Sequence, residues 1–325
     1  MVINRAAILK AAGERLVVED TSYVKPGAGQ VLIKVQAAAI NVADHILQDT
    51  GLFIRNWPYT LGSDVAGTIE EAGPGSSFQP GDRVYAHCNQ KFSQGGFDES
   101  CAGFGGFQFY TLSLEDHTAK LPNAIGFEQG CVFPLSVTTA YAGLMTLGLN
   151  QPGSGYVFVW GGSSSVGTNA IQLFKNLGYT VITTASPRNF GYCREIGASE
   201  VFDYNGDDQP IIGFLKGKNL LGTLDAMSKE DTLKRCMKLV DGTVCSVAPG
   251  TEKIGPQVKT IYQAQDPHFN IQQKVYGEVL PKALGNGTFK PKPDPLVIGN
   301  GLEYAQEGID MCKKGVSARK VVFIL

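Results

Sequence analysis

The chain has 325 residues, of which 43% are hydrophobic and 18% are charged, and its formal net charge is −2. This length is sufficient for two domains of ordinary globular composition. Because no cluster of lysine and arginine stands out, neither nucleic acid nor a membrane is expected as a partner. Seven cysteines without a C-x-x-C pair favour a reducing compartment. Without a secretory signal or an apolar run of ~18 residues, we expect a cytoplasmic protein.

The first 125 or so residues are predicted to be rich in β-strands. Short apolar runs at 31–36 and 66–72 are typical of strands, and Gly-Pro and Pro-Gly pairs after them indicate turns. From about Glu128 the pattern changes to that of a helix. Residues 129–149 are small or apolar on most faces, which predicts a buried helix.

Strands and helices then alternate along the chain. The pattern predicts strands at 156–160, 179–184, 200–203, 224–226 and 243–247, and helices at 166–177, 188–196 and 231–239. Such alternation requires crossover connections and produces a parallel sheet. Helices at 275–284 and 302–314 and a strand at 320–324 complete the chain. The segment 250–270 looks short for a full sixth strand of the sheet with its connections.

A glycine-rich segment joins the first strand of this alternation to its helix. Gly162 and Gly167 match the first and third glycines of the dinucleotide fingerprint G-x-G-x-x-G, and Ser164 replaces the second. Small residues at this place let the backbone turn sharply, and the helix N–H groups point at a pyrophosphate. A merely tight strand-to-helix turn is the alternative, because degenerate glycine patterns arise readily. The predicted cofactor contacts in this loop are Gly162, Ser163, Ser164, Ser165, Val166 and Gly167.

The end of the second strand predicts which dinucleotide binds. A site for NAD usually carries Asp or Glu there to hold the ribose 2′-hydroxyl, whereas residues 184–189 read Thr-Ala-Ser-Pro-Arg-Asn. A 2′-phosphate would meet the hydroxyl of Ser186 and the guanidinium of Arg188. Asn189 in the same segment and Tyr204, at the end of the third strand, are further expected contacts. We therefore expect NADPH, although Arg188 as a solvated charge and Tyr204 as a packing residue are open alternatives.

Several segments occur in a characteristic order: Asn41–Asp44, Leu61–Gly67, Pro80–Val84, Gly161–Gly167 and Gly315–Val322. With them the whole chain resembles the medium-chain dehydrogenase/reductase superfamily. The resemblance implies an α/β fold with a GroES-like β-rich catalytic domain and an inserted Rossmann domain with a doubly wound parallel sheet. Residues 1–125, with a C-terminal return at 271–325, would form the catalytic domain, and residues 126–270 the NADPH-binding domain. The cofactor would lie in the cleft between them, in a monomer or a homodimer.

The chain departs from the zinc-dependent alcohol dehydrogenases of that superfamily. Those enzymes hold a catalytic metal with a Cys, a His-Glu pair and a second Cys, and the matching positions here are Asn41, Ser63-Asp64 and about Leu135. A catalytic Zn²⁺ needs three N or S donors, which this set does not supply. We therefore expect no metal. Without a Lewis acid to stabilise an alkoxide, the similarity to zinc-independent quinone and enoyl reductases implies reduction of a polarised C=C bond.

The resemblance also implies roles for residues outside the phosphate loop. The expected catalytic residues, which would hydrogen-bond the nicotinamide or a developing enolate, are Asn41, Thr139 and Tyr141. The expected substrate contacts are Phe53, Trp57, Tyr59 and Thr138. Further cofactor contacts are expected from Asp44, Val247, Ala248, Ser317 and Ala318. Structural roles are the alternatives: a turn for Asn41, a helix cap for Asp44, and packing for Tyr141 and the aromatic residues.

The loop and the segment Thr183–Phe190 resemble most the fungal trans-acting enoyl reductases of polyketide pathways. The expected reaction is NADPH-dependent hydride transfer to the β-carbon of an enoyl or enone substrate, with protonation by solvent. The expected partner is a small or carrier-bound unsaturated carbonyl compound, and a polyketide synthase is a candidate protein partner. A broad-specificity quinone reductase and a non-catalytic NADPH-binding protein are the two alternative functions.

Overall fold

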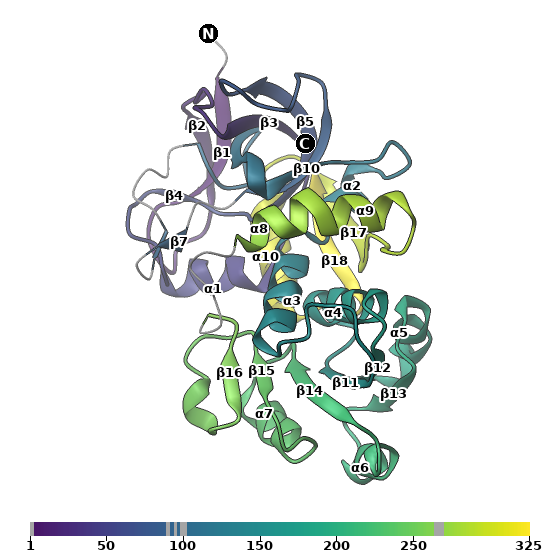
Figure 1. The fold of residues 1–325 in the computed structure, drawn as a ribbon. Helices are drawn as coiled ribbons and strands as arrows, with labels where there is room; N and C mark the ends of the chain where they lie inside the picture. The colour runs from purple at the N-terminus through teal and green to yellow at the C-terminus, as the bar shows by residue number, and fades with distance from the viewer. Residues whose placement is uncertain (1–2, 89–91, 94–95, 98–102, 263–269) are drawn as a thin grey trace. The chain divides into compact units, whose positions relative to one another are not determined.

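The computed structural model describes residues 3–88, 92–93, 96–97, 103–262 and 270–325, which fold as two units (Figure 1). The first unit comprises Met1–Leu135, Tyr276–Lys282 and Asp294–Leu325, and the second comprises Ser136–Val275 and Ala283–Pro293. The chain therefore leaves the first unit and returns to it twice. In the described residues, no helix combines the length and the apolar character needed to span a membrane.

The first unit consists mostly of antiparallel strands in two main sheets. The smaller sheet has the order β2-β1-β4, formed by β1 (Asn4–Leu9), β2 (Val17–Thr21) and β4 (Tyr59–Thr60). The larger sheet has the order β10-β6-β5-β3-β18-β17, and β9 also pairs with β3. Its strands are β3 (Gln30–Ala39), β5 (Asp64–Ala72), β6 (Arg83–His87), β9 (Tyr110–Leu114), β10 (Thr118–Lys120), β17 (Asp294–Asn300) and β18 (Arg319–Ile324). Two short strands, β7 (Phe92–Ser93) and β8 (Gly96–Phe97), pair with each other.

The helical elements that lie wholly in the first unit include α1 (Val42–Thr50), η1 (Glu115–His117), α2 (Phe127–Gly130) and α10 (Tyr304–Lys314). The segment Tyr276–Lys282 adds most of η4 (Val275–Val279) and the start of α9 (Leu280–Gly285) to this unit. Helix α10 packs on α1 and on β18. Apolar side chains that alternate along β3, such as Ile33 and Val35, join Val65, Phe107 and Phe323 in one buried core. Strand β18 lies in the interior of the larger sheet, antiparallel to β3 and parallel to β17.

The second unit is built around a six-stranded parallel sheet. Its strands are β11 (Tyr156–Trp160), β12 (Thr180–Ala185), β13 (Glu200–Asp203), β14 (Leu220–Asp225), β15 (Val244–Ser246) and β16 (Val258–Thr260). They lie in the order β13-β12-β11-β14-β15-β16, and all neighbours are parallel. This order corresponds to two mononucleotide-binding halves that meet between the first and fourth strands of the unit. The Rossmann part of the expected fold is therefore confirmed.

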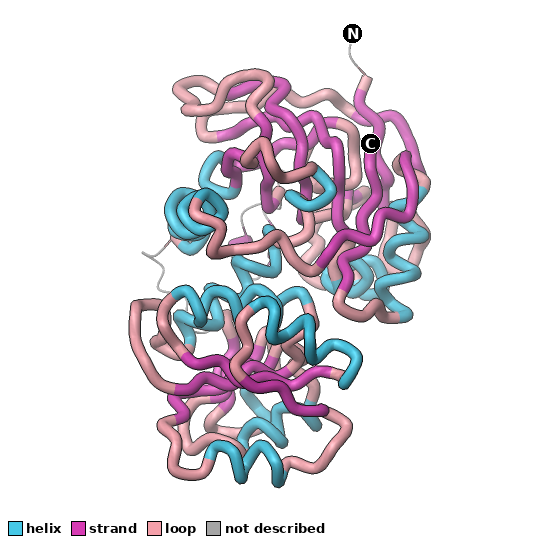
Figure 2. The backbone as a smooth tube through the Cα atoms, turned by 90° about the vertical axis from the view of Figure 1, so that its right-hand side faces the viewer, coloured by secondary structure: helices cyan, strands magenta, loops and turns pink. Residues whose placement is uncertain are grey.

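Helices cover both faces of this parallel sheet (Figure 2). The longer helices are α3 (Pro134–Thr146), α4 (Ser165–Asn176), α5 (Phe190–Ile196), α6 (Gln209–Leu215) and α7 (Glu230–Met237). The shorter ones are η2 (Pro187–Asn189), η3 (Glu252–Ile254) and α8 (Ile271–Lys274). On one face, Phe158 and Ile182 of the sheet pack with Leu215 of α6 and Leu233 of α7. Strand β11 is buried along its interior, as a strand covered on both faces must be.

Three elements differ from the sequence expectation. The single helix expected at 129–149 is wrong, because the chain forms α2, then an irregular turn, and restarts at Pro134, which has no N–H and suits a first helical position. The helix expected at 275–284 is present within a continuous helical segment that begins at Ile271, but its first half, Val275–Val279, is π-helical and α9 follows, with Pro281 at the second position of α9. The sheet also has the sixth strand that 250–270 seemed too short to hold, because β16 needs only three residues; residues 263–269 lie outside the described part.

Candidate functional site

The loop between β11 and α4 has the geometry that its glycines predict. Gly161 has a φ of +80°, and its N–H donates to the Thr184 hydroxyl at 3.0 Å. A Cβ on Gly167 would lie 2.2 Å from the carbonyl oxygen of Gly161, so only glycine fits at this close approach. Ser164, which replaces the second glycine of the fingerprint, caps α4 by accepting the Gly167 N–H at 3.1 Å. The N–H groups of the first turn at Ser165 and Val166 have no intrahelical acceptor and can bind an anion.

The end of β12 lies against this loop through a chain of polar contacts. The Asn189 amide donates to the Ser186 hydroxyl at 3.1 Å and to the Ser163 hydroxyl at 3.3 Å. Asn189 is buried, whereas Arg188 is exposed beside it. The structure thus brings Ser163, Ser186 and Asn189 together, and Arg188, which precedes Asn189 in the chain, is exposed. A phosphate group at this edge would meet hydroxyl, amide and guanidinium donors and no carboxylate of β12.

Tyr204 follows β13, and a single arginine organises the loop that carries it. Arg235 of α7 donates to the backbone oxygen of Tyr204 at 2.6 Å and to that of Gly206 at 2.9 Å. Its guanidinium also pairs with Asp208 at 2.6 Å and lies 4.5 Å from the centroid of the Trp160 ring. The Tyr204 side chain itself is 40% exposed. Arg235 therefore fixes the backbone of the loop while the phenol remains available to a ligand.

The fourth and fifth strands of the unit also end in polar turns. The buried Asp225 carboxylate accepts the N–H groups of Met227 at 2.8 Å and Ser228 at 3.0 Å, and the Thr232 hydroxyl at 2.5 Å. Ser228 has a φ of +50° and accepts the N–H of Val247 with its hydroxyl at 2.8 Å. Val247 and Ala248 are half-buried. The carboxyl ends of β11, β12, β14 and β15 thus form one edge of the sheet, where ligands of open α/β sheets bind.

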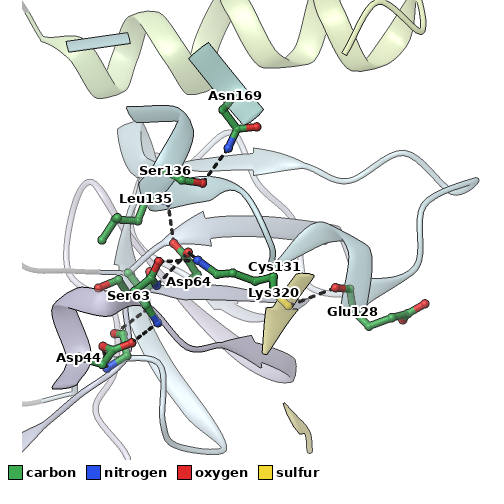
Figure 3. A network of polar contacts seen from close by, with 12 residues as sticks. Asp44, Ser63, Asp64, Glu128, Cys131, Leu135, Ser136, Asn169 and Lys320 are labelled. Atoms are coloured by element: carbon green, nitrogen blue, oxygen red, sulfur yellow. Dashed lines mark hydrogen bonds and ion pairs between the residues drawn. The ribbon is translucent and has the colours of Figure 1, made fainter. Parts of the chain in front are cut away.

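A separate buried polar network in the first unit includes Asn41, Asp64 and Leu135, which were expected to match metal ligands of zinc-dependent alcohol dehydrogenases (Figure 3). The Asp64 carboxylate accepts the Leu135 N–H at 2.7 Å and the Asn41 side-chain amide at 3.0 Å. The Lys320 ammonium of β18 donates to Asn41 Oδ1 at 2.5 Å and lies 3.4 Å from Asp64 Oδ2. Asp44 accepts the backbone N–H groups of Asn41 at 2.7 Å and of Gly62 at 3.2 Å.

Burial dominates the electrostatics of this network. It raises the pKa of Asp44 to about 7, against the backbone N–H groups of Asn41 and Gly62, which favour the charged form. It also raises the pKa of Asp64, and the nearby Lys320 ammonium opposes that shift. One oxygen of Asp44 accepts the N–H of Asn41 at the start of α1, so Asp44 caps the helix, and the other oxygen ties the helix start to the backbone at Gly62.

The remaining predicted residues lie in both units. Thr138, Thr139 and Tyr141 lie on α3, where Tyr141 is only 3% exposed. Tyr59 belongs to the buried core of the first unit, and Phe53, with a φ of +69°, packs on the edge of that core. Trp57 is exposed on the same unit. Ser317 and Ala318 precede β18, with a φ of +50° at Ala318. The roles of these residues stay predictions.

Two residues of the candidate site were missed in the sequence. Lys320 stands at the start of an apolar strand, and a lysine in such a run was a usable signal of a buried cation. Arg235 lies on a charged helix in the sequence Asp-Thr-Leu-Lys-Arg, and nothing local distinguishes it from a solvated residue. Its partners lie 27 to 31 positions earlier in the chain.

Comparison with known proteins identifies what the chain is similar to. Residues 27–123 match the model of the alcohol dehydrogenase GroES-like domain. The chain is 34% identical to "Dehydrogenase azaJ" of Aspergillus niger, with 100% of both chains covered. It is also 34% identical to "Trans-enoyl reductase himH" of Aspergillus japonicus, over 99% of this chain and 97% of the relative. The mycobacterial protein Rv1454c, solved as a complex with NADPH, has the same fold at a TM-score of 0.75 and 22% identity, over 99% of this chain and 100% of that one.

Proposed function

The chain belongs to the medium-chain dehydrogenase/reductase superfamily, and from this we propose that it is an NADPH-dependent reductase of an α,β-unsaturated carbonyl compound. The observation that carries the proposal is the similarity along its whole length to a fungal trans-enoyl reductase. The phosphate loop and the edge of the parallel sheet support the cofactor part of the proposal. The buried network at the matched metal positions supports a reaction in which this chain's own side chains provide the polar contacts.

The residues present fit an NADPH molecule. Because Gly167 has no Cβ, the first turn of α4 approaches the Gly161 carbonyl oxygen closely, as the fingerprint glycines of a dinucleotide site require. The amides at the start of α4 would hold the pyrophosphate, and Ser186, Arg188 and Asn189 would hold the 2′-phosphate. Tyr204, on the loop fixed by Arg235, would contact the same phosphate or the adenosine. Bound there, NADPH supplies a hydride, which carries the two electrons of the reduction.

The chemistry requires this chain to stabilise charge on the substrate oxygen. When a hydride adds to the β-carbon, the C=C electrons move to the α-carbon and the carbonyl oxygen, and NADP⁺ is left. A hydrogen-bond donor aimed at that oxygen lowers the barrier. Asn41 is the donor that we assign to this oxygen, with Thr139 and Tyr141 as further hydroxyl groups near the reaction. A proton from solvent then adds to the α-carbon, because we assign no side chain as a dedicated proton donor.

The substrate that we assign is an enoyl thioester of a secondary-metabolite pathway. Phe53, Trp57, Tyr59 and Thr138 are its assigned contacts. A carrier domain of a polyketide synthase would deliver such a thioester, and a short thioester of pantetheine tests the same chemistry without the carrier.

NADPH consumption with a matched panel of substrates tests the function. We expect turnover of crotonyl-type and longer enoyl thioesters of pantetheine, with a saturated thioester as the inert control. Strong turnover of quinones with inert enoyl thioesters would replace this function by that of a quinone reductase. Silence across the whole panel, with NADPH still bound, would favour a non-catalytic NADPH-binding protein.

Cofactor choice gives a second prediction. Arg188→Gln should weaken NADPH binding by about 10- to 100-fold, the usual size of a charge-assisted hydrogen bond to phosphate, and should leave NADH binding unchanged. The measurement is a fluorescence titration of both cofactors. Arg194→Gln is the matched control, because Arg194 lies on the next helix and pairs with Glu200 at 3.1 Å instead. Equal losses for NADPH and NADH would contradict the assigned role of Arg188.

A further inference from the structure

The buried cation Lys320 is not explained by the needs of folding alone. Its side chain is 4% exposed and Asp64 is fully buried, and burying such an ion pair is weak support for stability because both charges lose their hydration. An apolar pair of similar size would pack at this place at little cost. A stabilising role therefore does not account for the Lys320–Asp64 pair. Both residues also contact Asn41, and these contacts indicate a functional role for the pair.

The two charges dictate which way the Asn41 amide points. Lys320 can only donate, so it must face Oδ1, and Asp64 can only accept in its charged form, so it must face Nδ2. A flipped amide would place N–H groups against an ammonium and an oxygen against a carboxylate. The amide therefore has a single orientation, in which its oxygen accepts from Lys320. One of its N–H groups donates to Asp64, and the second N–H has no acceptor within the network.

The ammonium also changes the strength of that second N–H. A cation bound to the amide oxygen draws electron density through the O–C–N group, and hydrogen bonds that share a group strengthen one another in a low-dielectric interior. Asn41 is 5% exposed, so its surroundings are of that kind. The effect is that the second N–H of Asn41 is a stronger donor than that of an isolated amide.

We propose that Lys320 is a positioning residue, which fixes and polarises the Asn41 amide so that its free N–H donates to the substrate oxygen that gains negative charge. The inference rests on the proposed reductase function. In this role Lys320 acts through Asn41 and touches neither substrate nor cofactor. It also predicts the substrate class more closely, because an acceptor oxygen conjugated to the reduced bond is required.

Variants of Lys320 test the proposal. Lys320→Met should lower kcat for the enoyl thioester by an amount on the order of 10- to 100-fold, with little change in KM or in NADPH affinity. Lys320→Arg keeps a cationic donor and should recover most of the lost rate. Lys313→Met is the control for loss of a lysine, because Lys313 is an exposed residue that pairs with Asp49 at 2.6 Å and should leave kcat unchanged.

Two further variants separate positioning from folding. Lys320→Met combined with Asp64→Asn removes both charges, so that no unpaired ion is buried; we expect it to unfold within a few degrees of the wild type and still to have the low kcat. In an Asn41→Ala background, Lys320→Met should lower kcat no further, because its target is gone. Wild-type kcat in the combined variant, or fully additive losses in the Asn41→Ala background, would overturn the inference while the proposed function stands. A wild-type chain silent on every enoyl thioester would refute the proposed function, and with it this inference.

Discussion

Replacement of Gly167 by alanine is expected to lower NADPH affinity by at least about 100-fold, or about 3 kcal/mol. The new methyl group would lie 2.2 Å from the Gly161 carbonyl oxygen and 2.9 Å from Cα of Gly162, and these are backbone atoms of the loop itself. The clash can be relieved only if the first turn of α4 moves away from the backbone of Gly161 and Gly162. Because the pyrophosphate is assigned to the amides of that turn, binding suffers more than folding does.

A fluorescence titration with NADPH measures the loss, and circular dichroism reports whether the second unit stays folded. Gly213→Ala is the matched control: Gly213 is exposed on α6, and a Cβ there meets nothing within 4 Å. That control should keep wild-type affinity and unfold at the same or a slightly higher temperature, since alanine is favoured in a helix. An NADPH affinity of Gly167→Ala within threefold of the wild type would refute the assigned phosphate loop.

The first unit is expected to lose about 2 kcal/mol of stability between pH 6.5 and pH 4.5 through a single histidine. His87 is half-buried on β6 and stacks on His117 at 5.9 Å between centroids. Its two ring nitrogens are buried and have no hydrogen-bond partner among the described residues. Burial, with His117 beside it, lowers its pKa from 6.5 to about 3. Below pH 6.5 His87 becomes protonated in the unfolded chain but stays neutral in the folded chain. The free energy of unfolding therefore decreases as the pH is lowered, until about pH 3.

His87→Phe keeps the stacked ring and removes the titration. We therefore expect urea unfolding of this variant to depend much less on pH over the same range. The chain has two tryptophans, Trp57 in the first unit and Trp160 in the second. A Trp160→Phe background lets Trp57 fluorescence report the first unit alone. His45→Gln is the control, because the His45 side chain is 21% exposed and Asp49 opposes the burial that lowers its pKa. Equal acid losses in His87→Phe and the wild type would contradict the assignment.

The parallel sheet could be predicted because its determinants are local. Apolar runs such as Tyr156–Trp160 are bounded by glycines and followed by helical patterns, and the sheet order follows from short, right-handed connections. The loop at Gly161–Gly167 was predicted for the same reason. Local chemistry also explains why the single helix expected at 129–149 is wrong. Pro134 suits the first position of a helix, so α3 begins there, separate from α2.

The network around Asn41 could not be predicted in full, because its members come from distant parts of the chain. Lys320 lies 279 positions from Asn41, and only the pairing of β18 with β3 brings the two together. A register shift of one residue on β18 would turn Lys320 to the opposite face of the sheet. The identity of Asn41 as a site residue came from resemblance, whereas the direction of its amide required the structure.

The interior position of β18 has a consequence for biosynthesis. Its residues Val322–Ile324 pair with Ala37–Ala39 of β3, which a ribosome makes before the second unit, whereas the six strands of the second unit all lie between residues 156 and 260. The parallel sheet can therefore assemble on the nascent chain while the large antiparallel sheet still waits for a strand in its middle. During that interval β3 has an open edge where β18 will pair, and we expect chaperones to bind there until β18 has been made.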